Sequence, residues 1–171
     1  SARPEWRVPE KNGIFTIDHT PMNLQCVNDT IMLDSTEVWT IVNKTKHAHP
    51  MHIHDIHFWV LDAVDTETGE AVDPDNWPNI FYGPKDNVLV LPNWKLRLVA
   101  SFEDFGTAIA PENSYMYHCH ILPHEDRGMM GQFVVWDGSV VSNIESIEVP
   151  QQEMLLYPNP ATHKVYLKGS S

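Results

Sequence analysis

Eight of the ten histidines in this 171-residue chain gather in two short clusters. The first cluster is HAHPMHIHDIH and contributes His47, His49, His52, His54 and His57. The second cluster is HCHILPHEDRGM, which contributes His118, His120 and His124 and adds Cys119 and Met129. Imidazole, thiolate and thioether groups are ligands of transition metals. The two clusters therefore predict metal binding.

Side-chain direction separates these ligands into two groups. Each cluster lies at the end of a strand-like run, and in an extended segment residues i and i+2 share a face while i+1 points the opposite way. His118 and His120 should therefore face one side of the chain and Cys119 the other. His52 and His54 should likewise share a face. One short strand end is thus expected to serve two metal sites on opposite faces.

The predicted site on the Cys119 face has a blue-copper ligand set. A thiolate and two imidazoles in a trigonal plane, with a long axial Met, form the copper site of electron-transfer proteins. Cys119, His124 and Met129 come from one loop at spacings of +5 and +10, and the first cluster offers His49 as the second imidazole. Zinc accepts Cys and His but has no use for a thioether. The residue types favour copper.

The opposite face receives four imidazoles, from His52, His54, His118 and His120. A set without thiolate or carboxylate suits copper, zinc or iron. Cys119 is covalently adjacent to both His118 and His120. That adjacency offers an electron a short through-bond route from one predicted site to the other.

Short strands separated by turn residues must position both sites. Runs with period-two alternation recur between Pro, Gly, Asn and Asp residues. The predicted strands are Phe15–Asp18, Glu37–Asn43, His57–Val64, Asn87–Leu91, Leu96–Glu103, Ser114–His118 and Gly131–Trp136. No segment shows a sustained helical apolar stripe, and 13 prolines are spread along the chain. The pattern predicts an all-β fold, a β-sandwich or small barrel with Greek-key connections.

Length and composition fit one folded domain with tails. The domain is predicted to span residues 13–149, after a polar linker at residues 1–12 that would lead from a missing upstream domain. Residues 150–171 are predicted to be a connector and the truncated start of another domain. A net charge of −12 argues against a nucleic-acid-binding protein. No apolar run approaches the length of a membrane span, which is about 18 residues.

HPMHIH followed by HCHILPHEDRGM resembles the C-terminal copper-binding domain of multicopper oxidases, the laccase and cuprous-oxidase family. The resemblance runs from Gly13 to Trp136 and includes the KDNVLV strand. It implies a cupredoxin-type fold. Family members take electrons from a reducing substrate at a type 1 copper and reduce O₂ to water at a trinuclear copper cluster. The resemblance assigns type 1 copper to His49, Cys119, His124 and Met129, type 2 copper to His52, and type 3 copper to His54, His118 and His120.

One departure from the family pattern concerns the trinuclear cluster. The cluster needs eight histidines in the family, and four of them normally come from two HxH motifs of an N-terminal cupredoxin domain. This chain supplies only the other four, so it resembles the last domain of a longer oxidase and is expected to be inactive alone. The alternative is a stand-alone blue-copper electron carrier or copper-binding module, which would leave His52 and His54 unexplained. Copper nitrite reductases share the type 1 loop but lack a histidine after the cysteine, so His120 argues against them.

Four further residues lie outside the two predicted ligand sets. Glu125 follows the predicted ligand His124, at the position where the family places a proton relay. Such a relay would be needed because the reduction of O₂ to two waters consumes four protons. The alternative is that Glu125 belongs to a solvated turn. His47 is expected to be an exposed loop residue and His57 to orient a ligand or a substrate. Cys26 is expected to be a buried free thiol. No feature selects among phenols, metal ions and other reducing substrates.

The C-terminal segment LYPNPATHKVYLKG resembles the opening of the sorting domain used for type IX secretion in the Bacteroidetes. The resemblance implies that the parent protein is bacterial and exported to the periplasm, the cell surface or the medium.

Overall fold

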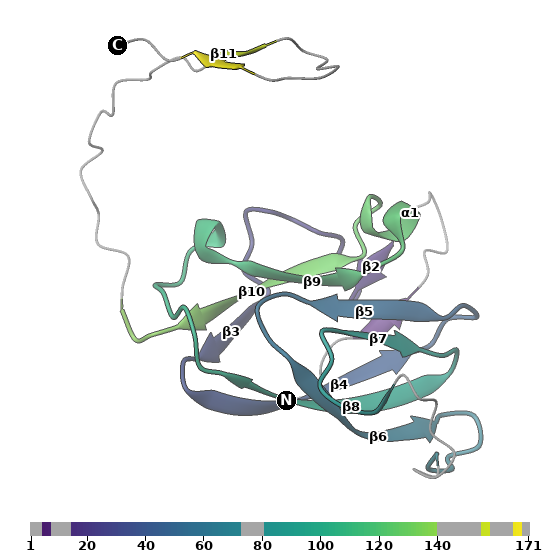
Figure 1. Ribbon diagram of the computed structural model, residues 1–171. Coiled ribbons are helices and arrows are strands. Elements are labelled where there is room, and N and C mark those ends of the chain that lie inside the picture. Colours follow the sequence, from purple (N-terminus) through teal and green to yellow (C-terminus); the bar gives the residue numbers. More distant parts are fainter. Residues whose placement is uncertain (1–4, 8–14, 73–80, 140–154, 158–165, 169–171) are drawn as a thin grey trace. The chain divides into compact units, whose positions relative to one another are not determined.

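The chain folds into a β-sandwich followed by a separate C-terminal unit (Figure 1). The computed structural model describes residues 5–7, 15–72, 81–139, 155–157 and 166–168. The first unit comprises Ser1–Val141 and the second Ser142–Ser171. In the second unit, β11 (Leu155–Tyr157) pairs with β12 (Tyr166–Lys168) in antiparallel fashion. Among the described residues, no helix combines the length and apolarity that crossing a membrane requires.

Two five-stranded sheets form the sandwich. The first sheet has the order β2-β1-β4-β8-β6. Its strands are β1 (Glu5–Arg7), β2 (Thr16–Ile17), β4 (Ser35–Asn43), β6 (Phe58–Asp65) and β8 (Trp94–Phe102). The second sheet has the order β3-β10-β9-β5-β7. Its strands are β3 (Asp29–Met32), β5 (His49–Ile53), β7 (Asn87–Val90), β9 (Tyr115–Cys119) and β10 (Met130–Trp136).

Aromatic side chains from both sheets fill the space between them. Trp39 of β4 lies 5.6 Å from the ring of Tyr117 and 5.8 Å from that of Phe133, edge to face in both cases. Phe102 of β8 packs on Phe133 at 5.8 Å. Edge-to-face pairs stabilise a core beyond the area that they bury. The packed core fixes β9 and β5, which carry four of the eight predicted ligands.

The all-β prediction is confirmed, and seven strands begin and end within a few residues of the predicted ranges. The sequence pattern predicts no strand at β1, β3 or β5. β5 contains the HPMHI motif, in which Pro50 has no N–H for the sheet and two histidines interrupt the apolar alternation. The predicted strand in this region begins only at His57. The pairing of β5 with both β7 and β9 nevertheless makes the motif a strand.

The ends of the first unit differ in part from the sequence-based expectation. Glu5–Arg7 lie within the predicted linker, yet they form β1 and pair with β2 and with β4. The predicted boundary at residues 149 and 150 lies outside the described residues.

The prediction for Cys26 is wrong: its thiol is exposed. Asn23 shapes the turn there, because its side chain accepts the Gln25 N–H and its carbonyl accepts the Cys26 N–H.

Gly131 allows a close approach between β10 and the ring of Tyr117. A β-carbon at residue 131 would overlap that ring, which is held by packing on Trp39 and by a 2.9 Å hydrogen bond from its hydroxyl to Asp29. We expect Gly131→Ala to destabilise the sandwich by about 1–3 kcal/mol, the usual effect of overpacking. Urea unfolding measures this change. Glu103→Ala, at an exposed position directly after β8, should stay within about 0.5 kcal/mol, and equal stability of the two variants would contradict the prediction.

Candidate metal centre

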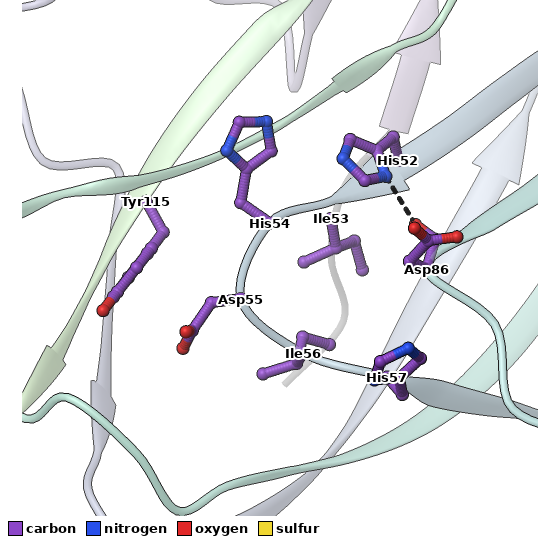
Figure 2. A pocket seen from close by; sticks show the side chains of 8 residues that line it. All are labelled: His52, Ile53, His54, Asp55, Ile56, His57, Asp86 and Tyr115. Atoms are coloured by element: carbon purple, nitrogen blue, oxygen red, sulfur yellow. Dashed lines mark hydrogen bonds between the residues drawn. The ribbon is translucent and has the colours of Figure 1, made fainter.

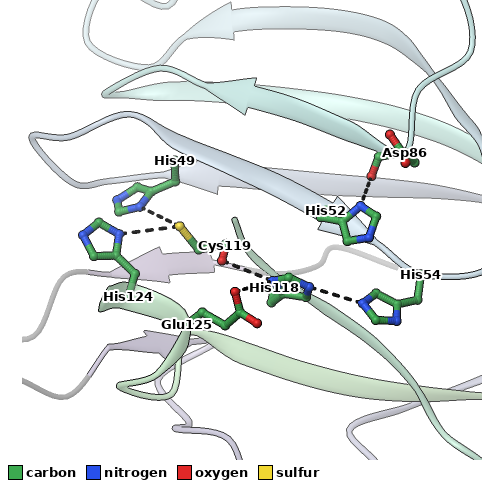
Figure 3. A network of polar contacts seen from close by, with 8 residues as sticks. All are labelled: His49, His52, His54, Asp86, His118, Cys119, His124 and Glu125. Carbon is green, nitrogen blue, oxygen red and sulfur yellow. Dashed lines mark hydrogen bonds and ion pairs between the residues drawn. The ribbon is translucent and has the colours of Figure 1, made fainter. Parts of the chain in front are cut away.

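Two groups of metal-binding side chains lie on opposite faces of the β5–β9 pair (Figure 3). The register places Met51 opposite Cys119 and His52 opposite His118. His49, Met51 and Ile53 are buried, while His52 is only partly so. The predicted division between the two faces is therefore what the structure contains: His49, Cys119 and His124 form one group, and His52, His54 and His118 form the other.

The Cys119 group has the spacing of a metal site. Cys119 Sγ lies 3.6 Å from His49 Nδ1 and 3.5 Å from His124 Nδ1. A transition metal about 2.3 Å from a thiolate and about 2.0 Å from an imidazole would separate the two donor atoms by roughly 3.7 Å in a trigonal plane. One sulfur and two imidazole nitrogens at these distances fit a copper ion of the blue type.

The loop after β9 brings the other two predicted ligands of this group back to Cys119. His124 lies in the short helix α1 (Leu122–Glu125), and the ring of Phe15 stacks on it at 4.3 Å. Met129 is fully buried. Its N–H donates to the His124 carbonyl at 3.0 Å, and its carbonyl accepts the Cys119 N–H at 3.1 Å. The backbone of Met129 is thus hydrogen-bonded to two of the predicted ligands.

Burial sets the protonation of the Cys119 group. It raises the pKa of the Cys119 thiol to about 11, with a smaller contribution from Glu125. It also lowers the pKa of His49 to about 4, helped by the charges of His124 and His47, and it lowers that of His124. Both imidazoles are therefore neutral near pH 7, with lone pairs available to a metal. The thiol must release its proton when a metal binds, as is general for cysteine ligands.

The second group consists of imidazoles in mutual contact. His54 Nε2 and His118 Nε2 are 3.2 Å apart, close to the roughly 3.3 Å between two nitrogens on one tetrahedral metal. The ring of His52 lies 5.0 Å from that of His54 and 5.3 Å from that of His118. His120 is exposed and lies at the margin, with its ring 5.6 Å from His52 and 5.7 Å from His118. The structure thus places all four predicted histidines side by side.

Backbone carbonyls orient two of these rings. His52 Nδ1 lies 2.9 Å from the Asp86 carbonyl, which can only accept, so the proton is on Nδ1 and Nε2 keeps a lone pair. His118 Nδ1 lies 3.2 Å from the Cys119 carbonyl and 3.4 Å from a carboxylate oxygen of Glu125, so it too carries the proton. Such partners fix the tautomer and the orientation of metal-binding histidines. The sequence pattern did not reveal Asp86, because it acts through its backbone.

An open pocket borders the second group (Figure 2). Its lining consists of His52, Ile53, His54, Asp55, Ile56, His57, Asp86 and Tyr115. Burial and the charge of Asp104 raise the pKa of Asp55. His57 is exposed and lines this pocket, and the hydrogen-bond partner of His52 Nδ1 is the Asp86 carbonyl. His47 is exposed, as predicted.

Comparison with known proteins places the chain in a family. The sequence profile of the family described as multicopper oxidase matches residues 4–139. The chain belongs to the multicopper oxidase family. Copper is therefore the metal that fits the two groups, and the predicted family is confirmed.

Similar proteins carry the same description. The chain is 37% identical over 128 residues to a multicopper oxidase of Staphylococcus haemolyticus, an alignment that covers 72% of this chain and 25% of that protein. It is 33% identical over 123 residues to a laccase of Bacillus subtilis, covering 65% of this chain and 22% of that protein. The chain thus spans about a quarter of the length of the curated relatives that it matches.

Solved structures of multicopper oxidases share the fold. A metallo-oxidase of Campylobacter jejuni matches with a TM-score of 0.61 at 31% identity, over 73% of this chain and 24% of the other. A multicopper oxidase of Pediococcus acidilactici matches with a TM-score of 0.62 at 29% identity, over 80% of this chain and 26% of the other. The sandwich is accordingly of the cupredoxin type that the resemblance implied.

Proposed function

We propose that this chain is the C-terminal domain of a multicopper oxidase and takes part in the reduction of O₂ to water. In this proposal His49, Cys119, His124 and Met129 hold a type 1 copper that accepts electrons from a reducing substrate. His52 is a type 2 copper ligand, and His54, His118 and His120 are type 3 ligands. The observation that carries the proposal is the placement of thiolate and imidazole groups back to back on the β5–β9 pair.

The residues of the chain divide the work between the two faces. Copper, when bound, supplies one-electron oxidation and reduction at each site. Burial of Cys119 and His49 keeps water from the sulfur, and the Asp86 carbonyl holds His52 with a free Nε2. Cys119 is bonded through the main chain to His118 and His120, and the Cys119 carbonyl also accepts from His118 Nδ1. These bonds join the two donor groups over a short covalent path.

Glu125 is proposed to supply protons. Its carboxylate lies 3.4 Å from Nδ1 of the proposed ligand His118, and its side chain is 27% exposed. The carboxylate therefore meets solvent on one side and the imidazole group on the other. A general acid in that position can take a proton from water and hold it beside the site of O₂ reduction.

The four imidazoles of the second group are proposed to be half of the trinuclear site, with the other half supplied by an upstream cupredoxin domain of the same protein. The chain spans about a quarter of its curated relatives, which leaves room for such domains. Similar proteins are described as a laccase and as a metallo-oxidase. The reducing substrate is therefore proposed to be a small organic molecule or a metal ion.

A second candidate function is a blue-copper electron carrier or copper-binding module without catalysis. It is favoured by one observation. The Cys119 group draws all its proposed ligands from this chain, whereas the imidazole group supplies only four of the eight histidines that a trinuclear cluster needs in the family. Both functions require the type 1 site. Copper titration tests that site directly, and we expect one intensely coloured copper per chain.

Export of the parent protein is also proposed. Its support is the resemblance of LYPNPATHKVYLKG to a type IX secretion sorting segment. Fractionation of the source cells, with an antibody against the sandwich, tests the proposal, and recovery from the cytosol alone would contradict it.

Met129→Leu should leave copper bound and raise its reduction potential. The thioether donates electron density to the oxidised metal, and a leucine of similar volume removes that donation from the fully buried site. Voltammetry of the copper-bound protein measures the change. Met130→Leu, one residue along and partly exposed, is the matched control. An unchanged or lowered potential in Met129→Leu would remove Met129 from the axial role.

A further inference from the structure

The loop between β4 and β5 carries His49 into the core and is held by Asn43. The Asn43 side chain is fully buried and donates to the carbonyls of His47, Val90 and Leu91 at 2.8–3.1 Å. Its carbonyl oxygen accepts the Thr45 N–H at 2.9 Å. The loop is therefore anchored to the end of β7 on one side and to Thr45 on the other. This anchoring fixes the position of Thr45 next to His49.

The Thr45 hydroxyl sits at the centre of three hydrogen bonds. Thr45 is 5% exposed, and its Oγ1 lies 2.8 Å from Nε2 of the fully buried His49. The hydroxyl donates to the His47 carbonyl at 2.9 Å, and it accepts the His47 N–H at 3.2 Å. A hydroxyl has one proton and two lone pairs. With its proton on the His47 carbonyl, Oγ1 can only accept from His49 Nε2–H.

We infer that Thr45 is a positioning residue of the proposed type 1 site, whose hydroxyl holds His49 as the Nε2–H tautomer with Nδ1 turned to Cys119. The role of Thr45 at a copper site rests on the proposed function. The tautomer of His49 rests only on the hydrogen bonds of the Thr45 hydroxyl. Nδ1 lies 3.6 Å from Cys119 Sγ and is the atom that a metal between them would need. A proton on Nδ1 would block that position.

The same hydrogen bond acts on the electronic character of the ring. A ring N–H that donates to an acceptor makes the other ring nitrogen a better electron donor, and loss of such a partner typically lowers metal affinity about 10–100-fold. A more strongly donating imidazole stabilises Cu²⁺ relative to Cu⁺. Removal of the hydroxyl should therefore weaken copper binding and raise the reduction potential.

The first test needs no metal. Long-range ¹H–¹⁵N correlation spectra of the metal-free full chain at neutral pH report which nitrogen of His49 carries the proton. We expect Nε2–H in the wild-type protein and a shift towards the Nδ1–H form in Thr45→Val, which keeps the shape but lacks the hydroxyl. Thr45→Ser should retain the Nε2–H form. A wild-type His49 protonated on Nδ1 would overturn the inference, even if Thr45→Val did not fold.

The second test uses copper. Competition with a Cu⁺ chelator should show affinity at least about tenfold weaker in Thr45→Val, with an affinity close to wild type in Thr45→Ser. The potential should rise in Thr45→Val alone. Thr40→Val, on β4 but away from the site, is the matched control. A Thr45→Val protein with unchanged copper affinity and reduction potential overturns the inference. A wild-type chain that forms no coloured copper site overturns the proposed function instead and leaves the tautomer of His49 as measured in the first test.

Discussion

Replacement of Cys119 by Ser should abolish the intense visible absorption of the copper-bound chain and leave the sandwich folded. The colour of a blue-copper site depends on a thiolate bound to Cu²⁺, and Cys119 is the one cysteine among the grouped side chains that the structure describes. A serine hydroxyl fits the same buried space and can hydrogen-bond to the nearby nitrogens of His49 and His124. It does not ionise near neutral pH, so no thiolate-like donor remains.

Visible absorption and electron paramagnetic resonance measure the loss of this site, and circular dichroism checks the fold. Cys26→Ser is the matched control, because the Cys26 thiol is exposed and belongs to neither group. Its spectrum should equal that of the wild type. A Cys119→Ser protein that stayed blue would show that the colour arises elsewhere, and the type 1 assignment would be wrong.

The division of the ligands between two faces could be predicted because it needs only the period of a strand. His118 and Cys119 alternate at the end of β9, and the structure places Cys119 with His49 on one face and His118 with His52 on the other. The same rule located seven strands. Both results depend on local alternation, which the sequence displays directly.

Long-range pairing and backbone contacts could not be predicted in the same way. β3 pairs in parallel with β10 across about a hundred residues, and β5 lies between two strands despite Pro50. The Asp86 carbonyl that orients His52 belongs to a residue whose side chain gives no hint of it. Thr45 sits between two lysines and has the composition of a solvated loop, yet Asn43 draws it into the core. Only the fold brings these groups to the ligands.

The chain alone should not reduce O₂ to water at an oxidase-like rate, whatever copper is supplied. Its second group offers four imidazoles, from His52, His54, His118 and His120. Three copper ions that need at least two protein ligands each require six or more. A longer protein that includes the proposed upstream domain should turn over, because that domain would complete the set.

Within the longer protein, His118→Ala should lower the turnover rate by more than about 100-fold. This is more than the loss of a residue that only hydrogen-bonds to a metal ligand would cause, which is about 10–100-fold. His118 is buried, contacts His54 through Nε2, and is joined to Cys119 by one peptide bond. His19→Asn is the matched control, since His19 is exposed and belongs to neither metal-binding group. An oxygen electrode measures the isolated chain, the longer protein and both variants. Four-electron reduction of O₂ by the isolated chain would show that copies of it assemble a full cluster between them, and the proposal of a missing upstream half would fall.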